Sequence, residues 1–90
     1  MDRNVVYKAL DTEREYQDEM IASDARADMV DNFSLGQAIL AMEHLLAEAR
    51  SFWYVDNPQE NFQTTMHRIR KVAGVAVQMG EKYGMPDRDG

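Results

Sequence analysis

Residues 57–84 read NPQENFQTTMHRIRKVAGVAVQMGEKYG, and this stretch carries the clearest helix start and stop signals of the chain. Pro58 fits the first position of a helix because an N–H there has no partner inside the helix, and Glu60 completes a capping box with the preceding asparagine. Gly84 is typical of a helix end, where the backbone often turns into the left-handed region. The stretch therefore predicts a helix over residues 58–83.

The apolar residues of this helix recur at intervals of three and four, so they form one stripe along its surface. The stripe consists of Phe62, Met66, Ile69, Ala73, Ala76, Gly80 and Tyr83, with Val72 and Met79 beside it. Several residues in the second half of the helix are small, namely Ala73, Gly74, Ala76 and Gly80. Small side chains would let the backbone of another helix approach closely.

Two further helices are predicted before this one. A stripe with similar spacing indicates a helix over about residues 2–22, for which Asp2 is the N-cap. Its members are Val6, Ala9, Leu10, Glu13, Tyr16, Gln17 and Met20. Ser34 and Gln37 form a capping-box pattern at the start of a helix over about residues 35–54. The stripe of that helix is Leu35, Ile39, Met42, Leu46, Ala49 and Trp53.

The segment 23–33 is polar and acidic and contains neither proline nor glycine, so it either extends the first helix or connects it to the second. The sequence carries no strand pattern and no internal repeat. It predicts a single all-α domain over residues 1–90, a three-helix chain that forms an antiparallel helical bundle with a second copy. A chain this short buries a modest core, which self-association enlarges. Leu40, Phe52, Trp53 and the small-residue face of the third helix are the expected dimer surface.

The composition narrows the classes of function. A net charge of −6 disfavours direct binding to nucleic acid, and the absence of cysteine excludes disulfides and thiolate metal sites. No window approaches about eighteen consecutive apolar residues and no signal pattern is present, so we expect no membrane insertion and a cytoplasmic location, in the host cytoplasm if the source is viral. Acidic residues concentrate in residues 11–31, which would suit a basic host protein, and basic residues in 67–71.

Glu13 lies in the middle of the apolar stripe of the first helix. A lone carboxylate in such a place is costly unless it is paired or bound to a metal ion. One interpretation is an internal salt bridge, with Arg70 or Arg50 as the partner. Another is a metal ligand or a base that faces a cavity in the bundle, and a third is an exposed position at the stripe edge.

Polar neighbours of Glu13 extend the candidate site. Tyr16 and Gln17 lie on either side of the same stripe, where they could bond to each other, hold Glu13 or face a ligand, with Tyr16 stacked on a base. Arg70 lies next to Lys71, and its guanidinium could hold a phosphate by two parallel hydrogen bonds. The alternative partners of Arg70 are Glu13, Glu43 and Glu81.

Glu43, on the second helix, is the best candidate for a second carboxylate near Glu13; a salt bridge on the flank of its helix is the alternative. The histidines do not add to this site. His44 and His67 project away from the apolar stripes of their helices, and no His-x-x-x-His or Glu-x-x-His pattern links them. The sequence therefore predicts no zinc site.

Two stretches of the chain resemble a known family. Residues 13–18 read EREYQD, and residues 69–88 read IRKVAGVAVQMGEKYGMPDR. In order and spacing they are similar to the short phage and prophage proteins labelled MazG-like, which carry a Glu-Arg-x-Tyr-Gln-Asp helix and an Arg-Lys…Glu-x-x-Gly-x-Pro-x-Arg ending. The resemblance extends over nearly the whole chain.

This resemblance implies an all-α nucleoside triphosphate pyrophosphohydrolase that dimerises or tetramerises and holds Mg²⁺ with Glu-x-x-Glu and Glu-x-x-Asp motifs. Such chemistry needs a metal ion to neutralise phosphate charge and a carboxylate to orient the attacking water. The resemblance implies that Glu13 is the catalytic residue or, with Glu43, a metal ligand. It assigns Tyr16 and Gln17 to the nucleotide pocket, and Arg70 and Lys71 to the phosphates.

The chain departs from the metal motifs of that family. Glu15 and Asp18 match the second motif by spacing, but the second helix has no Glu-x-x-Glu, since Glu43 and Glu48 are five residues apart. Gln37 stands where a glutamate commonly follows the helix cap. Three functions therefore stay open: a pyrophosphohydrolase, a non-catalytic module that sequesters a nucleotide or a host protein, and a purely structural oligomer.

Overall fold

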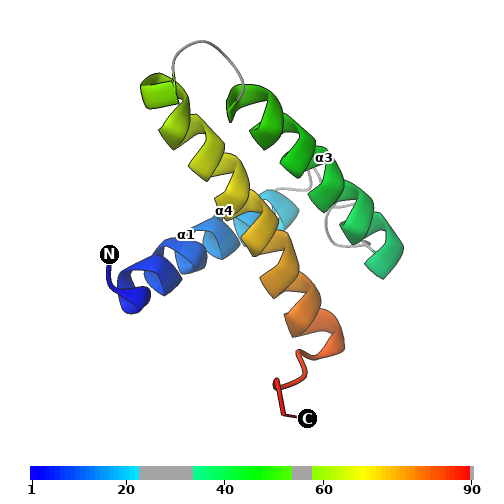
Figure 1. The fold of residues 1–90 in the computed structure, drawn as a ribbon. Coiled ribbons are helices and arrows are strands. Elements are labelled where there is room, and N and C mark those ends of the chain that lie inside the picture. Colours follow the sequence, from blue (N-terminus) through cyan, green and yellow to red (C-terminus); the bar gives the residue numbers. More distant parts are fainter. Residues whose placement is uncertain (23–33, 54–57, 90) are drawn as a thin grey trace.

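The computed structural model of the protein describes residues 1–22, 34–53 and 58–89. All regular structure in these residues is helical, as predicted. The helices are α1 (Arg3–Ala22), α3 (Leu35–Trp53) and α4 (Pro58–Tyr83) (Figure 1). Their bounds agree to within one residue with those predicted from the sequence. The two alternatives for the segment 23–33, and the asparagine cap before Pro58, lie outside the described residues.

The predicted capping residues hold three helix ends. The Asp2 carboxylate accepts a hydrogen bond of 3.3 Å from the backbone N–H of Asn4 at the start of α1. At the start of α3, Ser34 and Gln37 bond reciprocally, each side chain accepting from the backbone N–H of the other at 3.2 and 3.0 Å. Gly84 ends α4 with a φ of +89°, and its N–H donates to the carbonyl four residues earlier at 2.8 Å. These contacts satisfy backbone groups that a helix leaves free at its ends.

The buried apolar cluster of the described residues lies between α3 and α4. Ala38 of α3 is fully buried, and Val75 and Met79 of α4 pack with it, with partial cover from Met42 and Leu45. The buried side chains are small or flexible, and no large described side chain is fully buried. The core of one chain is therefore thin.

Polar contacts show that α3 and α4 run antiparallel. Near the start of α4, the Arg68 guanidinium forms an ion pair of 3.3 Å with Glu48 and lies 5.4 Å from the centre of the Phe52 ring. Both partners belong to the second half of α3, whereas the apolar cluster joins the first half of α3 to the second half of α4. The two helices lie side by side in Figure 1.

α1 packs on α4 alone. In the described parts of the chain it does not contact α3, so α4 is the central helix (Figure 1). α1 crosses α4 (Figure 1): Glu13 meets Arg70, whereas Arg14, one residue later, meets Glu81, eleven residues further along α4. Glu13 is the one buried residue among the described side chains of α1. The attachment of α1 is therefore largely polar.

Gly74 allows α1 to approach α4. A Cβ atom at this position would lie 2.7 Å from Cγ of Glu13 and 2.8 Å from Nε2 of Gln17. These separations are shorter than any real Cβ contact allows, so a side chain here would displace both residues. Gly74 is one of the small residues that were expected to allow a close helix approach, and the helix that approaches it is α1 of the same chain.

The apolar stripe predicted along α4 does not form the α3–α4 core. Phe62, Met66, Ile69 and Tyr83 are between 40% and 56% exposed, while the buried residues of α4 come from a neighbouring face. The predicted stripe of α3 is divided: Ala49 is buried and Met42 packs against the core. Its other members, Leu35, Ile39, Leu46 and Trp53, are about half exposed. Periodicity identifies the most apolar face of a helix but not the element that covers it.

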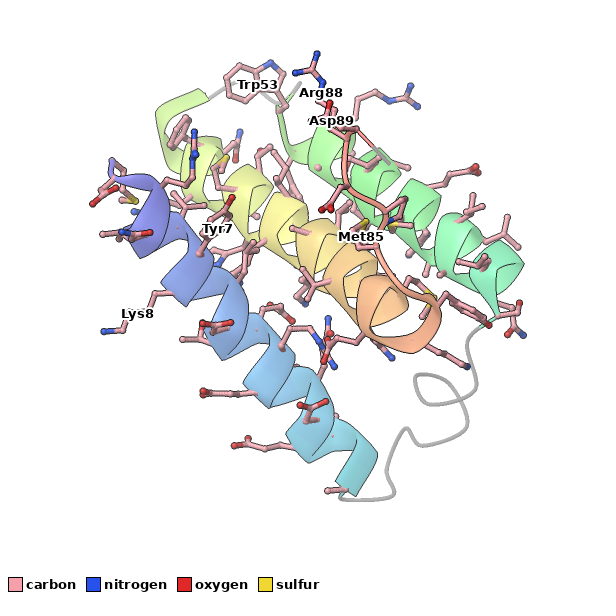
Figure 2. The ribbon with its side chains drawn as sticks, turned by 90° about the horizontal axis from the view of Figure 1, so that it is seen from below. Tyr7, Lys8, Trp53, Met85, Arg88 and Asp89 are labelled. Atoms are coloured by element: carbon pink, nitrogen blue, oxygen red, sulfur yellow. The ribbon has the colours of Figure 1, made fainter. Side chains whose placement is uncertain are left out.

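The residues expected at a dimer surface are partly available for one. Leu40 is 65% exposed, and Trp53 projects from the end of α3 (Figure 2). Phe52 is half-buried beneath Arg68. The small-residue face is partly covered within the chain: α1 lies over Gly74, and the side chain of Met85 lies over Gly80.

We expect Gly74→Ala to destabilise the protein. Alanine favours the helix by about 1 kcal/mol over glycine, but overfilling a tight contact typically costs about 1–3 kcal/mol. The net loss should appear in urea unfolding followed by circular dichroism.

Gly36→Ala is the matched control, because a Cβ there would meet nothing nearer than Oγ of Ser34 at 3.9 Å. This variant should be at least as stable as the wild type. A Gly74→Ala protein as stable as Gly36→Ala would contradict the close contact between α1 and α4.

Candidate functional site

The Glu13 carboxylate lies between α1 and α4 and is only 5% exposed. Its Oε1 accepts a hydrogen bond of 2.9 Å from Nε of Arg70, a residue 57 positions later in the chain. The Arg70 side chain is 32% exposed, so one end of the pair is near solvent. The salt bridge to Arg70 considered from the sequence is therefore present, whereas the Arg50 alternative is not.

Arg70 makes a second contact within α4. Its Nη1 donates to Nδ1 of His67, one turn earlier. Because Nδ1 accepts this bond, the proton of a neutral His67 ring is on Nε2. The guanidinium is thus oriented from two sides, by a carboxylate of α1 and by an imidazole of its own helix.

A pocket of about 260 Å³ opens beside this ion pair. It is lined by Thr12, Glu13, Tyr16, Arg70 and Lys71. Two helices contribute to it, and four of the five residues had been singled out from the sequence. Tyr16 is 51% exposed, so its ring is accessible at the pocket.

The pocket carries an excess of one positive charge. Glu13 balances Arg70, while Lys71 makes no ion pair with any residue that the structure describes. Lys71 is half-buried as a residue and lines the pocket. Such a lysine favours an anionic ligand.

Gln17 is directed elsewhere. Its side-chain oxygen accepts a hydrogen bond of 2.7 Å from Arg14, and its nitrogen lies against Gly74. Gln17 is not among the residues that line the pocket. The Gln17 side chain therefore helps to hold α1 on α4 and does not face the pocket.

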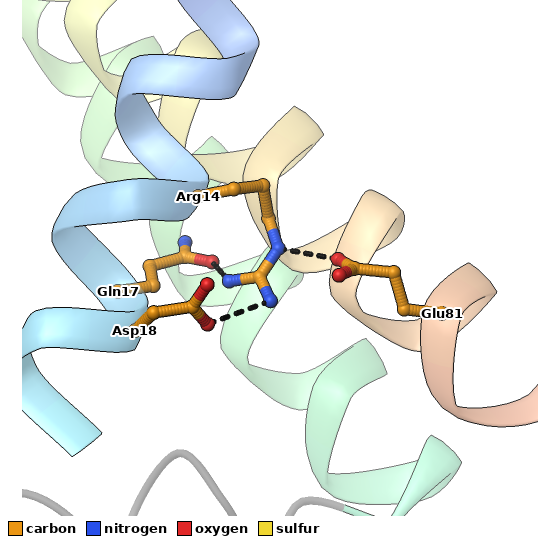
Figure 3. A network of polar contacts seen from close by, with 4 residues as sticks. All are labelled: Arg14, Gln17, Asp18 and Glu81. Carbon is orange, nitrogen blue, oxygen red and sulfur yellow. Dashed lines mark hydrogen bonds and ion pairs between the residues drawn. The ribbon is translucent and has the colours of Figure 1, made fainter. Parts of the chain in front are cut away.

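Arg14 forms a second polar network between α1 and α4, which the sequence analysis did not single out (Figure 3). Its guanidinium donates to Glu81 at 2.6 Å, to Gln17 at 2.7 Å and to Asp18 at 3.0 Å. The hydrogen bond that Arg14 donates to Glu81 raises the pKa of Arg14; burial opposes this, and the charge of Asp18 adds to it. Arg14 therefore stays charged at any working pH. The four-residue spacing of Arg14 and Asp18 was the one local signal for this network.

Glu43 does not join Glu13 within one chain. It lies on α3, beside Leu46, Ala47 and Arg50, and α3 does not contact α1 in the described residues. No group of three or more His, Cys, Asp or Glu side chains in residues 1–22, 34–53 and 58–89 is arranged to hold a metal ion. The two predicted Mg²⁺ ligands, Glu13 and Glu43, therefore lie on helices that do not contact each other within the described residues of one chain.

Comparisons with known proteins add no relative. No family model matches the chain, and no curated protein or solved structure is significantly similar to it. The resemblance to MazG-like proteins stays a hypothesis that rests on the two quoted motifs. None of the described helices is both long enough and apolar enough to cross a bilayer.

A double-mutant cycle should measure the pair at the centre of the site. We expect Glu13→Gln and Arg70→Met each to lower stability, with a coupling free energy of about 1–3 kcal/mol, because either change leaves its partner unpaired beside a buried position. Urea unfolding of the two single variants and the double variant gives this value.

The control cycle uses Arg14→Met with Asp18→Asn, since the Asp18 side chain is 64% exposed. Ion pairs four residues apart in a helix contribute about 0.3–0.5 kcal/mol, and Asp18 is in contact with solvent here although the Arg14 side chain is only 12% exposed. Equal couplings in the two cycles would show that the burial of Glu13 has no energetic consequence.

Proposed function

We propose that the protein binds a nucleoside triphosphate in the Glu13 pocket, as a relative of the MazG-like pyrophosphohydrolases. In this proposal Arg70 and Lys71 contact phosphate oxygens, and Tyr16 stacks on the base. Glu13 holds Arg70 in place. Binding, rather than catalysis, is the function that the described geometry supports best.

The observation that supports this proposal is the convergence of the candidate residues. Glu13, Tyr16, Arg70 and Lys71 were selected from their positions in the sequence, and all four line one pocket. They come from two helices that are separated by more than 30 residues of chain. Because Glu13 and Tyr16 lie one turn apart on α1 and Arg70 and Lys71 are adjacent on α4, the close approach of these two helices brings all four together.

The size and charge of the pocket support a phosphate ligand. A volume of about 260 Å³ is below the usual range for a whole drug-sized ligand, about 300–1,000 Å³, so only part of a nucleotide would be enclosed. Phosphates suit the enclosed part because the site has excess positive charge. The exposed ring of Tyr16 suits the base, since base stacking on an aromatic ring contributes about 1–3 kcal/mol.

Hydrolysis is the second candidate function, suggested by the resemblance alone. It would require Mg²⁺, and the described residues of one chain do not supply its ligands. We propose that the chain associates with a second copy, whose Glu43 is then the candidate for the missing carboxylate. Sequestration of a nucleotide without turnover needs no such addition.

Calorimetric titration with each of the common nucleoside triphosphates and their deoxy forms tests the binding proposal. We expect Lys71→Ala to weaken binding about tenfold or more, because a charge-assisted hydrogen bond contributes about 1.5–3 kcal/mol. Tyr16→Ala should weaken it by about fivefold or more through the loss of stacking.

Lys8→Ala is the matched control, since Lys8 projects from α1 away from α4 (Figure 2). It removes the same charge without touching the pocket. No binding of any nucleotide at millimolar concentration, with and without Mg²⁺, would refute the proposal. Equal losses in Lys8→Ala and Lys71→Ala would place the ligand elsewhere.

A pyrophosphate-release assay with Mg²⁺ separates the two candidate functions. Release that Glu13→Gln and Glu43→Gln both abolish supports an enzyme. Binding without release supports sequestration.

A further inference from the structure

The exposed apolar stripe of α4 has a regular spacing along most of the helix. From Phe62 to Gly80, successive members are separated by four, three, four, three and four residues. This is the spacing of the seam between two helices that pack along their length. In the described structure no other helix covers the stripe over its larger side chains, which are 40% to 56% exposed.

The stripe changes in size at its midpoint. Its first half carries the large side chains of Phe62, Met66 and Ile69, and its second half carries Ala73, Ala76 and Gly80. The spacing is the same when it is followed from either end. Between Phe62 and Gly80, two identical stripes placed antiparallel would therefore match each large residue with a small one: Phe62 with Gly80, Met66 with Ala76, and Ile69 with Ala73. Tyr83 lies beyond this part of the stripe.

We propose that two copies of the chain pair through this stripe, with their α4 helices antiparallel about a two-fold axis near residue 71. The inference rests on the self-association included in the proposed function, but not on nucleotide binding. A parallel pair would instead place large residues against large ones at one end and small against small at the other. Only the antiparallel arrangement keeps the seam evenly filled.

The surroundings of the stripe suit a partner helix. The stripe contains no charged residue. Of the cations near its middle, Arg70 bonds to Glu13 and Arg68 pairs with Glu48, while Lys71 lies on the opposite face of α4, in the Glu13 pocket. Charged groups are depleted at the centre of protein interfaces because their desolvation is costly. Two α4 helices can therefore approach without a buried unpaired charge.

α1 extends the surface on one side of the stripe. A hollow of about 470 Å³ lies between α1 and the first half of α4. Its apolar walls are Met1, Val6, Ala9 and Leu10 of α1, and Met66, Ile69 and Ala73 of α4. A partner helix seated on the stripe would fill this hollow and cover the apolar side of α1.

At the end of the seam, the space over Gly80 is occupied by a side chain of the same chain. Met85 folds back against Gly80, so that its Cε would lie 3.0 Å from a Cβ added there. In the antiparallel pair, Phe62 of one copy faces Gly80 of the other and would meet this thioether. Sulfur–aromatic contacts of this kind are favourable.

Cysteine cross-linking tests the register, because the native chain contains no cysteine. We expect Ile69→Cys and Ala73→Cys to form a disulfide-linked heterodimer when the two variants are mixed and oxidised, and each variant to cross-link far more slowly alone. Met66→Cys mixed with Ala76→Cys should behave in the same way. Faster cross-linking of Ile69→Cys with itself would indicate a parallel pair and overturn the proposal.

Sedimentation velocity of an aspartate variant tests the surface independently. We expect Ile69→Asp to weaken dimerisation at least tenfold with unchanged helix content in circular dichroism. Leu40→Asp, on α3, is the control and should leave the dimer intact.

A wild-type monomer at all concentrations would refute both self-association and the seam. A dimer that Leu40→Asp disrupts and Ile69→Asp does not would refute the seam alone, and the nucleotide titrations are unaffected by either result.

Discussion

The attachment of α1 depends on one buried ion pair, Glu13 with Arg70. A carboxylate that is 5% exposed must have a partner, and Arg70 supplies it across the helix interface at 2.9 Å. Gly74 makes this geometry possible because it leaves room for the Glu13 side chain directly over the α4 backbone. The pair also defines one side of the pocket that contains Lys71 and Tyr16. The same interaction thus positions a helix and forms the candidate site.

The two helix pairs of the molecule are held in different ways. α3 and α4 share the apolar cluster around Ala38 and Met79, whereas α1 is joined to α4 through ion pairs. The outward faces of α3 and α4 remain apolar. The described ion pairs between helices are thus made within one chain, whereas the outward apolar faces of α3 and α4 are left uncovered, and an identical copy is a natural partner for such faces.

Local signals predicted the helices well, because caps and periodicity act over a few residues. Ser34 with Gln37, and Gly84, set helix ends as expected.

Long-range partners were harder to predict. Arg70 had several possible glutamates, and only the crossing of α1 over Gly74 selects Glu13. Glu81 was considered for Arg70 but binds Arg14, 67 residues earlier, which no local spacing encodes. Four of the five pocket residues could be predicted because their polar or charged side chains could bind a ligand. The separation of Glu43 from Glu13 could not be predicted, because it depends on which helices pack against each other.

The polar attachment of α1 has a consequence for the thermodynamics of the fold. The heat capacity of unfolding rises with the apolar area that becomes exposed and falls with the polar area. Separation of α1 from α4 would uncover Glu13, Gln17 and Arg14 more than apolar groups. That step should therefore have a small heat-capacity change, and its free energy should vary almost linearly with temperature. The α3–α4 pair, whose contact is apolar, should account for most of the curvature.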